Sequence, residues 1–430
     1  METIAIISLI VFCITVFSII LSLLNNWKLG KCSVYWIVAL SGAMVLLLLN
    51  LDYVQAILGA LIQNVALNPI KILIFFISMT IMSLILDKLG FFKFLANKCV
   101  KLAKNSQLKL FLIFYIIVSI LTIFTSNDIV ILSFVPFICY FCKNSEINPA
   151  PYVFSTFVAA NTWSMLFVIG NPTNVYLSTY AGLDFFSYLK VMALPTIVTG
   201  ILSFLVLYLL FRKELSKPIE NVHTEEIGIN KPLIVLNVIM LLSCIVTLAI
   251  SAYINLEMWY LALGFVIVQI IINLAYSLIT KKSLKYIGEA LKKAPWEFVP
   301  FLISMFVIIK CLEANGVIQI IADLFMLGDS VFTLGISAFL FSNIVNNIPM
   351  TTLFASILSK GSFGLDGVYA SVIGSNLGAI LTPVGALAGI MFLNILREKD
   401  VDFTIKSFVK YGVIVSVVSL FGALVTLYLI

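Results

Sequence analysis

The chain has 430 residues, of which 62% are hydrophobic and only 11% are charged. Soluble domains carry about 25% charged residues, so 26 Lys and Arg with 20 Asp and Glu cannot solvate the surface of a globule of this size. The composition therefore excludes a soluble enzyme, a nucleic-acid-binding protein and a disordered chain. Because a helix needs roughly 20 apolar residues to cross a bilayer, we predict an all-α polytopic membrane protein with about ten transmembrane helices.

Apolar segments long enough to span begin with residues 2–24. The later predicted spans are 33–50, 69–86, 151–180, 190–211, 232–252, 257–279, 297–312, 367–392 and 407–430, with interruptions in 151–180 and 367–392. Two more apolar stretches, 109–142 and 331–359, are broken in the middle. Their arms of roughly 13 to 16 residues measure about 20–24 Å, too short to cross. Paired segments of this kind in two halves are typical of re-entrant hairpins at a transporter's binding site.

Charge predicts the orientation of these segments. Residues 87–109 carry six Lys, and residues 280–296 carry five. Because Lys and Arg mark cytoplasmic loops, ten spans and two hairpins place both termini outside. The stretch before the first hairpin is rich in Lys, whereas residues 313–330 before the second hairpin contain three acidic residues and no Lys or Arg. The hairpins should therefore enter from opposite sides, as in inverted-topology repeats.

The predicted organisation follows from this topology. We expect a first transmembrane helix with a cytoplasmic loop (1–32), a first inverted repeat with its re-entrant hairpin (33–211), a cytoplasmic linker (212–231), a connecting transmembrane helix (232–256) and a second inverted repeat with its hairpin (257–430). The single histidine, His223, lies in the polar linker, so we expect no histidine-based metal centre.

Four polar clusters interrupt the apolar segments in the same order in each half. They are Thr125–Asp128 and then Asn161–Thr162 with Gly170–Asn174 in the first half, and Ser342–Pro349 and then Gly374–Gly378 with Thr382–Gly385 in the second. We match Asn127-Asp128 to Asn346-Asn347, and Pro172 to Pro383. Pro and Gly unwind a helix, and the exposed backbone groups must then face protein, water or a ligand because lipid cannot satisfy them.

The clusters therefore predict a small, hydrogen-bonding cage near the middle of the membrane. The predicted substrate-binding residues are Ser126, Asn127, Asn161, Thr162, Asn171, Thr173, Asn174, Asn346, Asn347, Ser375, Asn376 and Thr382. The predicted ion-coupling residues are Asn127, Asp128, Gly170, Asn346 and Gly385, with Na⁺ or H⁺ as the coupling ion and sodium near Asp128. Two alternatives remain: the small polar residues pack helices together, and Asp128 caps the second arm of its hairpin.

Several motifs resemble those of one family. They are Leu86–Phe92, Asn127-Asp128, Phe211–Lys213, Ala294–Trp296, Asn346–Pro349, Val368–Ala370 with Gly378, and Thr382–Gly385. The chain resembles the ion transporter superfamily, most closely its arsenite/antimonite efflux permease branch, with similarity to the sodium/anion symporters and sodium/proton antiporters. The resemblance implies a homodimer with a scaffold and a mobile transport region, coupling to a proton or sodium gradient, and in some members a separate ATPase subunit.

The chain departs from the permease pattern at Asn161 and Asn376, where the permeases have Asp. Asp128 is then the main titratable candidate, and sodium coupling stays open. We expect a secondary active transporter of a small oxyanion or metalloid acid in a bacterial plasma membrane, with no organic cofactor and no nucleic-acid partner. The alternatives are a sodium-coupled carboxylate or divalent-anion symporter, a sodium/proton antiporter, a channel or a membrane-embedded enzyme. An enzyme is disfavoured because the sequence contains no His pair, Cys/His pair, Gly-x-Ser-x-Gly motif or nucleotide loop.

Overall fold

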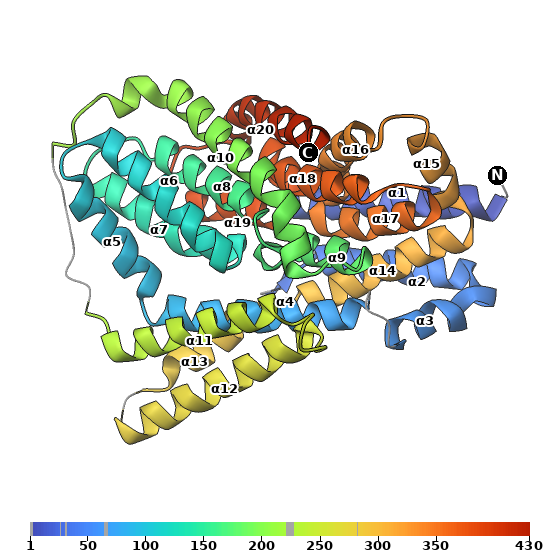
Figure 1. Cartoon of the computed structure of the whole chain (residues 1–430), viewed down its shortest axis with the longest axis horizontal. Coiled ribbons are helices and arrows are strands. Elements are labelled where there is room, and N and C mark those ends of the chain that lie inside the picture. The colour runs from blue at the N-terminus through green and yellow to red at the C-terminus, as the bar shows by residue number, and fades with distance from the viewer. Residues whose placement is uncertain (1–2, 26, 31, 64–67, 221–227, 282) are drawn as a thin grey trace.

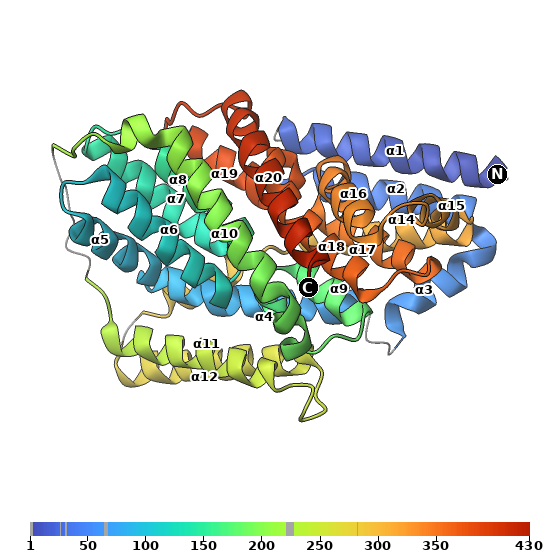
Figure 2. The same cartoon turned by 45° about the horizontal axis from the view of Figure 1, so that its top comes forward.

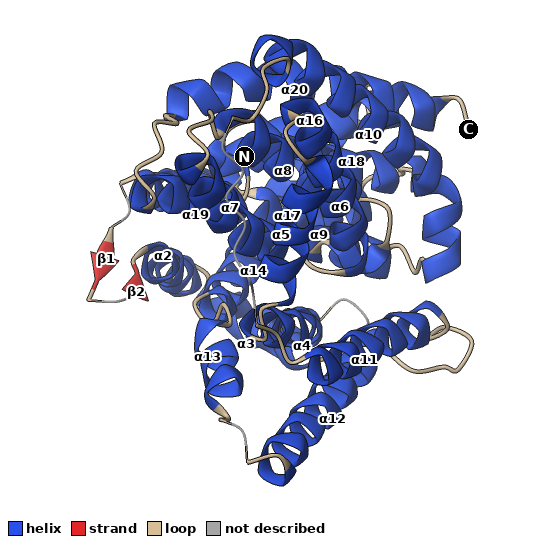
Figure 3. Ribbon diagram, turned by 90° about the vertical axis from the view of Figure 1, so that its left-hand side faces the viewer, coloured by secondary structure: helices blue, strands red, loops and turns tan. Residues whose placement is uncertain are grey.

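The computed structural model describes residues 3–25, 27–30, 32–63, 68–220, 228–281 and 283–430; His223 lies outside the described residues. The described chain is almost entirely helical (Figures 1 and 3), apart from a short antiparallel pair of strands, β1 (Lys28–Leu29) and β2 (Cys32–Ser33). This confirms the predicted all-α class.

The helices follow one order twice along the chain (Figure 1). After α1 (Thr3–Leu24), the first series is α2 (Tyr35–Leu49), η1 (Leu51–Tyr53), α3 (Val54–Ile62), α4 (Pro69–Lys88), α5 (Phe91–Ala103), α6 (Gln107–Phe124), α7 (Asn127–Asn144), α8 (Ala150–Trp163), η2 (Val168–Gly170), α9 (Pro172–Tyr180) and α10 (Phe185–Leu215). After α11 (Lys231–Ala249), the second series is α12 (Met258–Ile279), α13 (Lys285–Lys293), α14 (Phe298–Ala314), α15 (Val317–Phe325), α16 (Ser330–Val345), α17 (Asn347–Lys360), α18 (Leu365–Leu381), η3 (Pro383–Gly385), α19 (Leu387–Glu398) and α20 (Ile405–Tyr428). Elements α2 to α10 thus correspond in order to α12 to α20, including a short 3₁₀ turn (η2, η3) at the same place.

Local sequence explains where many of these helices begin. Asn68 caps α4 and is followed by Pro69, whose missing N–H costs nothing in the first turn. The side chains of Ser106, Asp184 and Asp329 accept hydrogen bonds from the first turns of α6, α10 and α16. These caps place the helix starts within a few residues of the predicted apolar boundaries.

The described residues contain seven helices that are long and apolar enough to cross a membrane: α1, α4, α6, α10, α11, α12 and α20. The number rises to nine if each of two bent helix pairs is counted as one span. One pair joins α2 to η1 and α3, and the other joins the helical stretch Lys285–Ala314 to α15. Eight of the ten predicted spans appear in this set. The other two, 151–180 and 367–392, are divided into α8, η2 and α9 and into α18, η3 and α19, as their Pro and Gly residues require.

The two series pack across each other (Figure 2). α2 of the first series packs against α14 of the second, and α12 of the second series packs against α4 of the first. In the same way α7 contacts α19, α17 contacts α9, and α10 contacts α20. The α11–α12 pair lies along one side of the molecule beyond α4 (Figures 1 and 2). The core between the series is dominated by aromatic rings, including Phe154, Phe157, Phe392 and Phe408.

Candidate functional site

Both predicted hairpins are present as pairs of neighbouring helices. α6 and α7 contact each other on either side of residues 125–126, and α16 and α17 do so on either side of Asn346. The arms of the first hairpin have 18 residues each, which is about 27 Å of helix. The prediction that both arms are too short to cross is therefore wrong for α6, which is long and apolar enough to span a membrane. Ser106 accounts for part of the extra length, because its cap starts α6 before the predicted boundary at residue 109.

The helix starts correct the predicted alignment of the two tips. Ser126 is the N-cap residue of α7, and Asn346 is the N-cap residue of α17. Asn127 therefore corresponds to Asn347, and Asp128 corresponds to Ile348. Asp128 lies in the first turn of α7, so the alternative that it is the cap of this helix is wrong. A carboxylate in this position is still favoured by the positive end of the helix dipole.

Asn346 has a strained backbone. Its φ is 72° and its ψ is 151°, a region that is essentially reserved for glycine and costs about 1–3 kcal/mol for other residues. Strain of this kind persists only where the surrounding structure imposes it. The side-chain amide donates to the carbonyl oxygen of Val384 in η3 at 3.1 Å, which ties this tip to the break that follows α18.

A hydrogen bond joins the first tip to the next helix. The Asn127 side-chain amide donates to the Oδ1 atom of Asn161 on α8 at 3.1 Å, and both side chains are buried. Asn161 occupies the twelfth position of α8, as Asn376 does in α18. The tip of the first hairpin thus has an asparagine beside it on the following helix.

Asn376 makes a different set of contacts, which cross between the halves. Its Oδ1 atom accepts from Ser164 at 3.1 Å and from the Asn171 amide at 2.9 Å, and its own amide donates to Asn174 at 2.8 Å. Asn174 in turn donates to the carbonyl oxygen of Ser164. Four side chains that are fully or almost fully buried therefore connect α18 to the unwound segment of the first half.

The unwound segments pack closely because of their glycines. A Cβ atom at Gly170 would overlap the carbonyl oxygen of Ser164, and one at Gly385 would lie 2.9 Å from Oδ1 of Asn343. The 3₁₀ turns also correct the predicted pairing of prolines. Pro383 begins η3, whereas Pro172 follows η2 as the first residue of α9, so Gly170 and Gly385 are the equivalent positions instead.

Several predicted site residues have buried polar atoms without a hydrogen-bond partner among the described residues. This is uncommon, because buried polar groups in folded proteins are nearly always paired. The atoms are Ser126 Oγ, Thr162 Oγ1, Asn346 Oδ1, Asn347 Oδ1 and Ser375 Oγ. Thr173 and Thr382 differ from these, since Thr173 contacts Asn174 at 3.4 Å and Thr382 donates to Asn343 at 2.7 Å.

One cavity of about 460 Å³ reaches the starts of three helices. Asp128 of α7, Ile348 of α17 and Leu387 of α19 all line it. No side chain caps any of these three helices, in contrast to α4, α6, α10 and α16. Their first-turn N–H groups therefore have no side-chain acceptor. The cavity extends to Lys292 and Lys293, at the end of the molecule where the lysine-rich segments lie.

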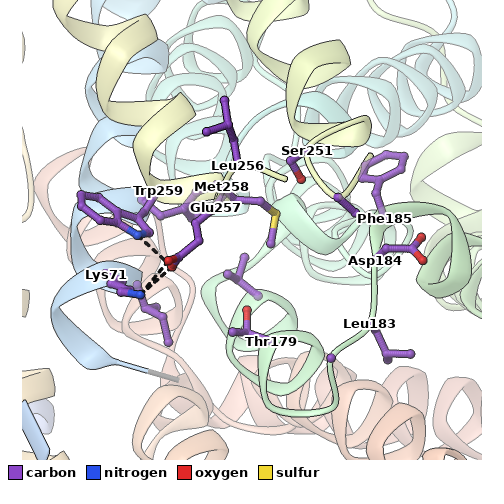
Figure 4. A pocket seen from close by; sticks show the side chains of 15 residues that line it. Lys71, Thr179, Leu183, Asp184, Phe185, Ser251, Leu256, Glu257, Met258 and Trp259 are labelled. Atoms are coloured by element: carbon purple, nitrogen blue, oxygen red, sulfur yellow. Dashed lines mark hydrogen bonds and ion pairs between the residues drawn. The ribbon is translucent and has the colours of Figure 1, made fainter. Parts of the chain in front are cut away.

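A second cavity has a volume of about 320 Å³ (Figure 4). It is bounded by the N-terminal end of α4, the turn between α9 and α10, and the start of α12. Lys71 and Glu257 form an ion pair at 2.6 Å on its wall, and the indole of Trp259 donates to Glu257 at 3.0 Å. None of the predicted site residues lines this cavity. Of these two cavities, the one at the lysine-rich end is lined by Asp128 and Ile348, directly beside the hairpin tips.

Sequence reasoning missed two residues that hold the site together. Ser164 contacts Asn376 and accepts from Asn174. Asn343 donates to the carbonyl oxygen of Gly378 at 2.9 Å and accepts from Thr382. Both lie within or directly beside the polar clusters, so their proximity to the breaks was the available signal.

A polytopic helical fold with broken helices and two hairpin tips beside one cavity is that of a membrane transporter. The chain belongs to the citrate transporter family (CitMHS), which matches residues 3–362. This agrees with the predicted membership of the ion transporter superfamily.

Named relatives cover most of the chain. It is 25% identical over 383 residues to an arsenical pump membrane protein of Escherichia coli, covering 82% of this chain and 84% of that protein. It is 24% identical over 434 residues to a 46 kDa membrane protein of Mycobacterium leprae, covering 97% and 98%. The fold is similar to the crystal structure of the Alcanivorax borkumensis YdaH transporter, with a TM-score of 0.58, 13% identity and 88% of each chain covered.

Proposed function

We propose that the protein is a secondary active transporter of a small oxyanion or metalloid acid, most like arsenite or antimonite efflux. One observation carries the proposal. Three helices without side-chain caps begin at the same cavity, beside buried Asn and Ser atoms that lack partners. Helix N-termini of this kind bind anionic or oxygen-rich ligands, and the unpartnered oxygens can accept hydrogen bonds or coordinate a cation.

The charge of the site favours a substrate with little charge. None of the twelve predicted substrate-binding side chains is cationic. The lysines that line the cavity, Lys292 and Lys293, are exposed, whereas the predicted substrate-binding residues at the tips, Asn346 and Asn347, are buried. A tricarboxylate would bring several negative charges to a site that already contains Asp128, and burying uncompensated charge is costly. Undissociated arsenious acid is a small triol that hydroxyl and amide groups can satisfy.

Asp128 is the proposed site of ion coupling, with Gly170, Gly385 and the tip asparagines supplying neutral oxygen ligands. Its carboxylate lines the cavity at the first turn of α7. Oxygen-rich groups suit a hard cation such as Na⁺, and a carboxylate inside the membrane also suits proton transfer. The proposal therefore includes either ion.

We also propose how the repeats, the termini and the cavity are arranged in the membrane. The repeated order of elements supports two repeats, 33–211 and 257–430, joined by the linker 212–231 and the connecting helix 232–256. The positive-inside rule supports a plasma-membrane protein with both termini outside, with the cavity of Asp128 open to the cytoplasm. The family resemblance supports an elevator-type motion and a homodimer, with a separate ATPase subunit as a further candidate partner.

A sodium-coupled carboxylate symporter is the second candidate. The family description favours it, as do the Ser, Asn and Thr clusters. Sodium/proton antiport through Asp128 is a third candidate. The candidates differ in what they move and in which gradient drives it, so they can be separated by one assay.

The test is flux in proteoliposomes under separate sodium and proton gradients, with arsenite, antimonite, citrate, succinate and sulfate as substrates. We expect arsenite or antimonite movement driven by one of the two gradients. Sodium-driven uptake of succinate or citrate without arsenite movement would instead establish the second candidate and overturn the first. A cation exchange that occurs without any of these substrates would indicate antiport.

Two variants at the tip of the second hairpin test whether transport depends on the candidate site. Asn346→Ala and Asn347→Ala should each lower flux to the level of empty vesicles, because each removes a buried side-chain oxygen that has no hydrogen-bond partner among the described residues. Thr247→Ala is the matched control, since Thr247 is exposed on α11 and bonds only within its own helix. Unchanged flux in both tip variants would remove the hairpin tips from the site.

A further inference from the structure

An apolar groove with a volume of about 370 Å³ runs between α5 and the first half of α11. Its walls are Phe91 and Phe94 from α5 and Ile234, Val235, Val238 and Ile239 from α11. The turn that precedes α5 lies beside the segment that precedes α11, since a Cβ atom at Gly90 would lie 3.7 Å from the side chain of Ile229, an ordinary van der Waals distance. The groove is therefore a formed feature between two elements that are far apart in the sequence.

The groove faces the bilayer. α11 is one of the helices that can cross a membrane. Val235 and Ile239 are 55% and 54% exposed in the isolated chain, whereas Ile234 on the inner side of the helix is 6% exposed. In a membrane, such exposed apolar side chains contact acyl chains rather than water.

The polar group that lines the groove lies at one end of it. Lys231 is the first residue of α11, and Ile239 lies eight residues further along the helix. Eight residues correspond to about 12 Å of helix, close to the depth of one leaflet of a hydrocarbon core about 30 Å thick.

We propose that this groove binds one acyl chain of an anionic phospholipid from the leaflet on the lysine-rich side, with its phosphate beside Lys231. Because the groove is about as long as one leaflet is deep, it fits an acyl chain of a lipid in the leaflet on the lysine-rich side. Lys231 at its end selects an anionic headgroup, because basic residues near a membrane surface attract acidic lipids. The positive-inside rule makes this the cytoplasmic leaflet.

A lipid bound in the groove would touch two elements that are connected to the candidate site. α5 connects α4 to the first hairpin, and α11 packs against α4. A lipid between α5 and α11 therefore contacts both the segment that leads to the site and the helix beside it. This consequence rests on the proposed function, whereas lipid binding itself does not.

The test measures retained lipid rather than transport. The purified full chain is equilibrated in micelles with phosphatidylglycerol and phosphatidylcholine at equal concentration, and the bound lipids are counted by native mass spectrometry. We expect one retained phosphatidylglycerol. Lys231→Gln should lower the preference for phosphatidylglycerol about fivefold, the factor expected for one lysine near an anionic surface.

Matched variants on α11 separate groove binding from general lipid contact. Val235→Trp fills the groove and should abolish retention, while Val246→Trp places the same ring on the same helix at a site that is 63% exposed and outside the groove. Equal retention of both lipids by the wild-type chain would overturn the proposal. So would retention in Val235→Trp equal to that in Val246→Trp, or a change from dimer to monomer on Val235→Trp, which would indicate that a second copy covers the groove.

Discussion

Gly374→Ala tests the close packing that holds the second half of the site. Gly374 and Gly378 lie four residues apart on α18, and the pairing of α18 with α16 is the most extensive helix contact among the described residues. A Cβ atom at Gly374 would overlap the carbonyl oxygen of Gly335 and lie 2.8 Å from both Cβ of Ala338 and the backbone nitrogen of Phe339. Small residues at a helix interface permit this approach of backbones in a membrane.

The expected effect follows from the distances. Backbone atoms cannot rotate away, so α16 and α18 must separate. The two contacts at 2.8 Å alone require roughly 0.6 Å to reach an ordinary contact of about 3.4 Å, and the overlap with the Gly335 carbonyl oxygen requires more. A gap of about 0.5–1 Å forfeits a quarter to a half of each dispersion contact, and overpacking of this kind costs about 1–3 kcal/mol. Since Ser375 and Asn376 lie between the two glycines, the displacement should also abolish transport.

Gly264→Ala on α12 is the control, because nothing lies within 4 Å of its ideal Cβ atom. Both variants gain the same helix propensity, about 1 kcal/mol, so their difference isolates the overpacking. We expect a lower midpoint of thermal unfolding in detergent for Gly374→Ala and a wild-type or higher midpoint for Gly264→Ala. Equal midpoints would refute the packing argument.

Three further variants examine the site and the second cavity. Asn376→Ala should lower the free energy of unfolding by about 1–3 kcal/mol, measured by thermal unfolding, because the buried Asn171 amide loses the oxygen to which it donates; an unchanged midpoint would contradict this. Asp128→Asn should remove the dependence of flux on whichever of the two gradients, sodium or proton, drives the wild-type chain in proteoliposomes, and a retained dependence would place ion coupling on another residue. Glu257→Gln should destabilise the chain by about 1–3 kcal/mol, because the Lys71 side chain, only 12% exposed, loses its ion pair; a wild-type midpoint would show that water replaces the carboxylate.

The positions of the helices could be read from the sequence because lipid imposes one solution. Apolar runs of about 20 residues must be helical in a bilayer, and Pro and Gly within such runs must interrupt them. The two broken spans and both hairpin tips were therefore predictable. The lengths of the hairpin arms were not, because the cap at Ser106 lies outside the apolar run.

The pairing of the two halves was predictable in outline but wrong by one residue at the tips. Sequence similarity aligned Asn127 with Asn346, whereas the helix starts align it with Asn347. A one-residue difference changes which groups face the cavity, because successive side chains on a helix point about 100° apart. The equivalence of Asp128 and Ile348 follows only from this alignment.

The sequence by itself determined that this chain is an all-helical membrane protein with two broken segments in each half, because composition and helix-breaking residues act locally. It also selected the polar residues at the breaks. Only the tertiary structure decided which of these residues meet: Asn127 with Asn161, and Asn376 with the unwound segment of the other half. The physical reason is that hydrogen bonds between distant segments depend on how whole helices pack, and no local pattern in the sequence encodes that geometry.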